Sequence, residues 1–160
     1  MLANAFRAAR LDTDFYNTVE RDTSYTPQAF GVVLVANGLA ALGTWFWVRD
    51  SFVGIVVGGL IAAVIVWVVW AALAAFIGTR FFGGTADTGE MLRVLGFAQA
   101  PVALGIVPGI GALVGTIWMI IASVVAIREG LDFTTGKAIG TLIVGWIAFV
   151  IIRGIFFFIF

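Results

Sequence analysis

The stretch Gly83–Lys137 decides the fold, and it reads GGTADTGEMLRVLGFAQAPVALGIVPGIGALVGTIWMIIASVVAIREGLDFTTGK. Two apolar segments meet in it at a break, Pro108-Gly109-Ile110-Gly111. An unbroken helix over residues 94–127 would hold about 34 residues and measure ~51 Å, well beyond the ~30 Å hydrocarbon core of a bilayer. The sequence therefore predicts two membrane helices in a hairpin that is broken at Pro108. Whether the first of them crosses fully or re-enters part way is left open, because both give the same chain ends.

The composition indicates that the bilayer is the solvent of this chain. Of its 160 residues, 62% are hydrophobic and 11% are charged, whereas soluble domains are about half apolar and a quarter charged. Basic and acidic residues balance at nine each, so no net charge indicates a nucleic-acid partner. The chain has no cysteine and no histidine, which removes thiol chemistry, the usual metal ligand and the usual general base at neutral pH.

The apolar runs predict an all-α fold, a polytopic transmembrane helix bundle. Thr26-Pro27 is a typical helix start, with proline at the first helical position. In the second apolar run, Gly54, Gly58 and Ala62 form a small-residue stripe, which favours helix packing within the chain over a dimer interface. Residues 27–160 are expected to form one membrane domain with five helices, at about 27–48, 52–78, 88–107, 110–127 and 136–160.

Residues 1–26 are polar and carry charges of both signs. Their apolar residues recur at helical spacing, so two short amphipathic helices are expected. We expect this segment to lie on the headgroups at the cytoplasmic surface, and docking to a partner is the alternative. No apolar run of a cleavable signal peptide follows its arginines.

The positions of the basic residues favour the hairpin. Cytoplasmic loops of membrane proteins are enriched in lysine and arginine. With a cytoplasmic N-terminus, the hairpin topology places about seven basic residues on the cytoplasmic side and about two, Arg49 and Arg153, on the far side. One unbroken span would place about six on the cytoplasmic side and about three on the far side. We therefore expect a multi-pass protein of the cell membrane with its C-terminus on the side opposite the cytoplasm.

Few polar residues fall inside the predicted membrane helices. Asn37 lies near the centre of the first, where we expect an interhelical hydrogen bond or, alternatively, a contact with a solute. Pro101 should kink the third helix, and Gln99 is placed to satisfy a carbonyl freed by that kink or to face a cavity. Pro108 makes the hairpin break. Arg153 is expected to extend to the outer surface, with a lipid-headgroup or partner contact as the alternative.

The charged residues before the hairpin are expected to form a cytoplasmic interface. Asp87 with Glu90 three residues later resembles a capping box, so a helix should start at Thr88. Glu90 and Arg93 are spaced to pair along the surface of that helix. Phosphate-loop and dinucleotide-binding motifs fail on their required spacings. No carboxylate pair, nucleophile–base pair or metal cluster is visible, so neither an enzyme nor a cofactor is expected.

Several segments in order resemble the Yip (Ypt-interacting protein) domain, most closely its short prokaryotic members. The lead-in Phe15–Gln28 is also similar. The resemblance covers nearly the whole chain, and it rests on Phe82-Gly83-Gly84-Thr85, Leu95-Gly96-Phe97-Ala98-Gln99-Ala100-Pro101, Pro108-Gly109-Ile110-Gly111, Ile117-Trp118, and Ala126-Ile127-Arg128 through Lys137-Ala138.

The resemblance implies a five-span domain with a cytoplasmic N-terminus. Binding of Rab-type GTPases, known for eukaryotic members, is not expected, because the chain lacks their long N-terminal region and their Asp-Leu-Tyr-Gly-Pro motif. We expect a non-enzymatic scaffold that organises membranes or acts in a trafficking-like role, and a translocator of a small solute, an ion or a lipid is the alternative. Its expected partners are the lipid bilayer and a second copy of the chain or another membrane protein.

Overall fold

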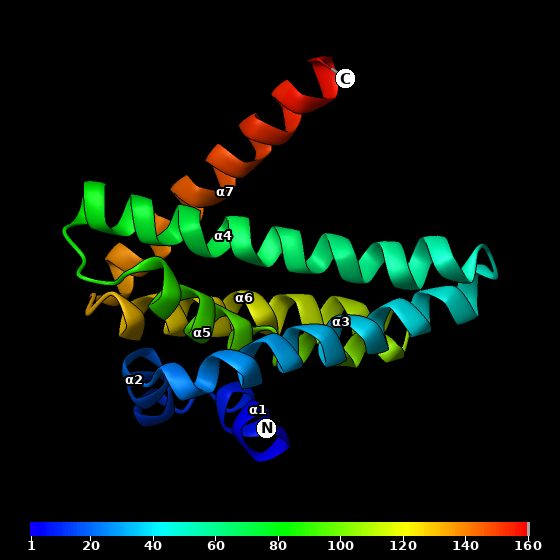
Figure 1. Ribbon diagram of the computed structural model, residues 1–160, viewed down its shortest axis with the longest axis horizontal. Coiled ribbons are helices and arrows are strands. Elements are labelled where there is room, and N and C mark those ends of the chain that lie inside the picture. Colours follow the sequence, from blue (N-terminus) through cyan, green and yellow to red (C-terminus); the bar gives the residue numbers. More distant parts are fainter. Residues whose placement is uncertain (160) are drawn as a thin grey trace.

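A computed structural model describes residues 1–159, except for the side chains of residues 152, 153 and 155–159. Within these residues every regular element is helical (Figure 1). The N-terminal segment before α3, called the tail below, forms α1 (Leu2–Ala9), α2 (Thr13–Arg21) and the short 3-10 turn η1 (Thr23–Tyr25). The bundle follows, with α3 (Thr26–Val48), η2 (Val53–Gly58), α4 (Gly59–Phe82), α5 (Thr88–Ala98), η3 (Ala100–Ile106), α6 (Ile110–Gly130) and α7 (Thr135–Ile159).

The helices form layers with the tail on one side. In Figure 1, α3, α5 and α6 lie between α4 on one side and α1 with α2 on the other, and α7 packs against α4 and α6 before it leaves the bundle. The core lies where α2, α3, α4, α5 and α6 meet. Its largest fully buried side chains include Tyr16 and Phe15 of α2 and Phe97 of α5.

Within the described residues, three helical stretches are long and apolar enough to cross a membrane: Thr23–Val48, Val53–Phe82 and Ile110–Gly130. Each has large apolar side chains exposed along its length, as expected for helices that face lipid rather than water. The described apolar part of α7, Thr135–Ile151, and the stretch α5–η3 are shorter. The five membrane helices expected from the sequence therefore stay a prediction.

The helix over residues 88–107 is in fact two helices. Its start agrees with the sequence, because Asp87 accepts from the Glu90 backbone N–H and the Glu90 side chain accepts from that of Asp87, both at 2.7 Å, which is a capping box. The α-helix then ends at Ala98, and a 3-10 helix with Pro101 in its first turn runs to Ile106. Proline has no N–H to donate to the preceding turn, so the α-helical ladder stops there.

The η3 helix lies between α3 and α6 at backbone distance. A Cβ atom on Gly43 of α3 would overlap the carbonyl oxygen of Gly105, and one on Gly115 of α6 would lie 2.6 Å from the Pro101 oxygen. At the other end of α6, Gly130 faces Met91 and Val94 of α5. The α6 helix therefore runs back along η3 and α5, and glycine is what lets these backbones approach.

The stripe predicted to pack within the chain does not do so. Gly54, Gly58 and Ala62 are exposed, and hypothetical Cβ atoms on the two glycines meet no other helix within 4 Å. The first of these glycines lies in η2, where the backbone is π-helical with i→i+5 hydrogen bonds. Spacing alone selected the wrong glycines, because the contacting ones are set by how η3 fits between its neighbours.

Thr141 of α7 gives a stability prediction. Its side chain is 1% exposed, and its hydroxyl oxygen has no hydrogen-bond partner within the described part of the chain. An unsatisfied buried hydroxyl costs about 1–3 kcal/mol, so Thr141→Val should raise the free energy of unfolding by about 1 kcal/mol. Thermal unfolding in detergent measures this, and a lower melting temperature would contradict it. Thr44→Val is the control, because the Thr44 hydroxyl is exposed and already bonded to the Ala40 carbonyl at 3.0 Å.

Candidate functional site

An amide pair joins α3 to the end of α5. The Asn37 side chain donates from Nδ2 to the Gln99 Oε1 atom at 2.6 Å and to the Val33 carbonyl oxygen at 2.8 Å. The interhelical hydrogen bond expected for Asn37 is therefore present. Its partner was not foreseen, since Gln99 was expected to satisfy a carbonyl near Pro101.

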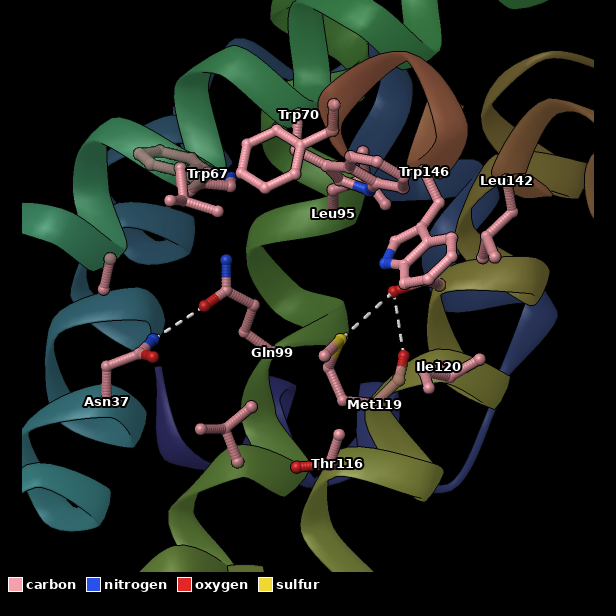
Figure 2. A pocket seen from close by; sticks show the side chains of 15 residues that line it. Asn37, Trp67, Trp70, Leu95, Gln99, Thr116, Met119, Ile120, Leu142 and Trp146 are labelled. Carbon is pink, nitrogen blue, oxygen red and sulfur yellow. Dashed lines mark hydrogen bonds between the residues drawn. The ribbon is translucent and has the colours of Figure 1, made fainter. Parts of the chain in front are cut away.

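These two hydrogen bonds fix which way both amides point. The Val33 carbonyl oxygen can only accept a hydrogen bond, so it must face the Asn37 Nδ2 group. Because Nδ2 also donates to Gln99, the Gln99 atom that meets it must be the oxygen Oε1. The Gln99 Nε2 group is left pointing away from Asn37. Figure 2 shows it facing the open space beneath Trp67 and Trp70.

That space is a cavity of about 560 Å³, within the range typical of small-molecule sites. Side chains from α3, α4, α5, α6 and α7, together with Val102 of η3, line it (Figure 2). Most of them are apolar or aromatic, including Trp67 and Trp70 of α4 and Trp146 of α7. The sequence indicated Gln99 as a candidate cavity wall, but no sequence pattern indicated these tryptophans.

Three other polar groups of the cavity are already hydrogen-bonded within the protein. The Thr116 hydroxyl donates to the Ala112 carbonyl and the Ser123 hydroxyl to the Met119 carbonyl, both at 2.8 Å. The Trp67 indole N–H donates to the Leu92 carbonyl at 3.0 Å, which fixes the plane of its ring. The Gln99 amide is therefore a lining group with a free donor for an occupant, as are the indole N–H groups of Trp70 and Trp146, which have no hydrogen-bond partner within the described residues.

A second polar cluster lies where the tail meets the bundle. Arg93 of α5 is 6% exposed and donates to the backbone carbonyls of Val19, at 2.9 Å, and Glu20. These are among the last carbonyls of α2, which have no partner within that helix and carry the negative end of its dipole. The Arg93 guanidinium donates to these carbonyls and places its positive charge at the negative end of the dipole, so it anchors α2 to α5.

Arg93 does not form the surface pair with Glu90 that its spacing suggested. The Glu90 carboxylate caps its own helix through the Asp87 N–H, while the arginine is buried against α2. Sequence spacing reports only on neighbours along one helix. The partner of Arg93 is instead a carbonyl of α2, 74 positions away in the sequence. The exposed Asp87 and partly exposed Glu90 carboxylates lie at the same end of the bundle.

Two more contacts hold the tail against the bundle, and a third joins its two helices. Asn17 of α2 donates to the Glu129 carboxylate at 2.9 Å, and Trp118 of α6 donates to the Ala9 carbonyl at 2.7 Å. The buried Tyr16 hydroxyl donates to the Ala8 carbonyl at 3.3 Å, and burial raises its pKa. The tail is thus part of the folded body rather than a separate segment.

Glu20 makes the docking of the tail sensitive to pH. The residue is 5% exposed, and burial raises the pKa of its carboxyl, opposed by a 3.0 Å contact with Arg21 and reinforced by the charges of Asp132 and Glu90. A pKa that is higher in the docked state means that the docked state binds the proton more tightly. Docking therefore weakens as the pH rises and the Glu20 carboxyl loses its proton.

Acidification from about pH 7 to about pH 5, towards the ordinary glutamate range, should therefore slow hydrogen exchange in α2. Glu20→Gln should give slow exchange at both pH values, because the amide has no charge to lose. Exchange that becomes faster on acidification, after correction for its intrinsic pH dependence, would contradict this prediction.

The remaining predicted site residues lie apart from the cavity or outside the described side chains. Pro108 sits in the turn between η3 and α6, beside Gly109, whose φ of 76° favours glycine. The side chain of Arg153 lies outside the described residues. Among the residues that the structure describes, no group of three acidic, histidine or cysteine side chains is placed to hold a metal ion.

The apolar surface, the helical bundle and the partly buried amide pair define a helical transmembrane protein. Residues 13–157 match the family model of the Yip1 domain, and the chain belongs to this family. The match covers nearly the whole chain and confirms the family suggested by its sequence segments. Comparisons with curated proteins and with solved structures found no match.

Proposed function

We propose that this Yip1-family protein is a non-enzymatic membrane-organising scaffold that acts through its cytoplasmic end. The observation that carries the proposal is the anchored tail, in which Arg93 holds α2 against the bundle. A tail fixed in this way presents a rigid surface to a partner, with Asp87 exposed and Glu90 half-buried at the same end.

The outer face of α1 supports a role at the membrane surface. Leu2 is 73% exposed and Phe6 is 60% exposed, and the Arg10 guanidinium lies 4.3 Å from the centre of the Phe6 ring. An apolar face with a flanking cation is the arrangement by which amphipathic helices lie among lipid headgroups. We propose that α1 sits in the cytoplasmic leaflet while α2 covers the end of the bundle.

The proposed topology has five membrane helices, with α5–η3 and α6 as the hairpin broken at Pro108 and with the N-terminus in the cytoplasm of a cell-membrane protein. The contact of Arg93 with the Val19 carbonyl and that of Asn17 with Glu129 support it, because they place the start of α5 and the end of α6, the two ends of the hairpin, against the tail. In intact cells, an impermeant thiol reagent should label Asp50→Cys and spare Thr18→Cys. The reverse pattern would refute this orientation.

The scaffold function is tested by crosslinking. The chain has no cysteine, so Thr18→Cys, exposed on α2, gives a unique attachment point for a crosslinker in native membranes. We expect a second copy or another membrane protein to be captured reproducibly and to persist in native mass spectrometry. Lone monomers in both experiments would refute the scaffold.

The cavity favours a second candidate function, translocation of a small solute, an ion or a lipid. Broken helices beside a polar group are typical of transport sites, and Gln99 lies where α5 gives way to η3. Purified protein in liposomes should then speed solute flux or lipid exchange between leaflets. Activity equal to that of empty vesicles would remove this candidate.

A further inference from the structure

The cavity beside Gln99 has the composition of a binding site for a neutral lipid. No charged side chain is found among the described residues that line it, and most of its wall is hydrocarbon or aromatic. An anionic headgroup would be buried there without a counter-charge, which is costly. The outer faces of α4, α6 and α7 carry exposed apolar side chains and so face the bilayer, which makes membrane lipids the available source of occupants.

The Gln99 amide demands an oxygen atom from that occupant. Its Oε1 atom is held by Asn37, and its Nε2 group has no hydrogen-bond acceptor within the described residues. A donor left unsatisfied in an apolar site is unfavourable by about 1–3 kcal/mol. A saturated hydrocarbon chain offers nothing to it, whereas a carbonyl oxygen accepts directly.

The aromatic walls favour a flat ring. Trp67 is fixed by its bond to Leu92, Trp70 meets Phe149 edge to face with ring centres 6.4 Å apart, and Trp146 stands on the opposite helix (Figure 2). Planar conjugated groups stack on such faces or meet their edges favourably. A ring that bears a carbonyl therefore uses both the aromatic walls and the amide donor.

We propose that this cavity binds a neutral lipid with a flat, carbonyl-bearing ring, the chemical class of the prenylquinones. The ring lies among Trp67, Trp70 and Trp146, and one carbonyl oxygen accepts a hydrogen bond from Gln99 Nε2. The isoprenoid tail extends between the helices toward the bilayer. The proposal concerns binding alone and does not depend on the scaffold function, because crosslinking reports partners and not occupancy of the cavity.

Quenching of tryptophan fluorescence tests the proposal directly. The full chain in nanodiscs is titrated with a short-chain prenylated benzoquinone, and saturable quenching is expected above the linear quenching of the Trp67→Phe, Trp70→Phe, Trp146→Phe triple variant, which has no tryptophan left in the cavity. A prenyl alcohol with the same tail does not quench and serves as competitor, and its inhibition constant for relieving the quenching should be at least tenfold higher than the dissociation constant of the quinone. Linear quenching, or equal displacement by the alcohol, would overturn the proposal.

Two variants separate the amide donor from general packing. Gln99→Leu should weaken quinone binding about tenfold, the effect of losing one hydrogen bond of about 1.4 kcal/mol. Thr44→Val is the control, because Thr44 lies outside the cavity and its hydroxyl is bonded within its own helix, so quinone affinity should stay within twofold. Trp146 is 62% exposed, so Trp146→Leu should preserve the fold and also weaken binding. Unchanged affinity in Gln99→Leu, or in Trp146→Leu if the first variant does not fold, would refute the assignment.

Discussion

Gly43→Ala should destabilise the bundle by about 3 kcal/mol, the upper end of the usual cost of overpacking. The added methyl group would overlap the carbonyl oxygen of Gly105 and lie 2.7 Å from that of Ile106. Both neighbours are backbone atoms of η3, which is held on its other side by α6, so neither can move aside cheaply. Reversible unfolding in mixed detergent and denaturant measures the loss of unfolding free energy.

The matched control for this prediction is Gly136→Ala. Gly136 is also helical, but a Cβ atom there meets nothing within 4 Å. Alanine is favoured over glycine in a helix by about 0.5–1 kcal/mol, so the control should be neutral or slightly stabilising. If the two variants unfold alike, η3 does not pack against α3 as closely as described.

Arg93→Leu should release the tail from the bundle. The substitution removes the donors to Val19 and Glu20 and leaves those carbonyls buried without a partner. Losing charged hydrogen bonds and stranding their acceptors costs about 3 kcal/mol, which is a change of roughly 100-fold in the docking equilibrium. Hydrogen exchange in α2 should accelerate by that factor while exchange in α6 stays unchanged.

Arg80→Leu provides the control, because Arg80 is an exposed arginine at the end of α4 and close to the same end of the bundle. It removes the same charge and should leave exchange in α2 as it was. Arg93→Lys should fall between the two, since one ammonium group replaces a fork of several donors. Equal protection of α2 in Arg93→Leu and Arg80→Leu would show that Arg93 does not anchor the tail, and that packing of Phe15 and Tyr16 with the remaining hydrogen bonds holds it.

Local signals in the sequence were sufficient for the helix boundaries that depend on neighbours along the chain. The Asp87–Glu90 capping box marked the start of α5, and Pro101 marked where its ladder is interrupted. Composition was sufficient for the membrane class. These features depend on residues within one turn of each other, which is the range over which sequence patterns are informative.

The candidate site depends on contacts that no local pattern contains. Asn37 and Gln99 are 62 positions apart, and the sequence marked each one without indicating that they meet. Arg93 was assigned to the surface because its true partners lie on α2, more than 70 positions earlier. Polar residues in an apolar run were thus worth noting, but their partners follow from how the helices pack.

The π-helical start of α4 has a consequence for sequence change within the family. A π-turn holds one residue more than the α-turn it replaces, and here it lies at the exposed end of the helix, between Val53 and Gly58. Deleting one residue there would let the backbone return to α-geometry without turning Trp67 and Trp70 away from the cavity. The 3-10 helix η3 contains no extra residue that a deletion could remove in this way. Related chains should therefore vary in length before α4 and keep a constant length between Gln99 and Pro108.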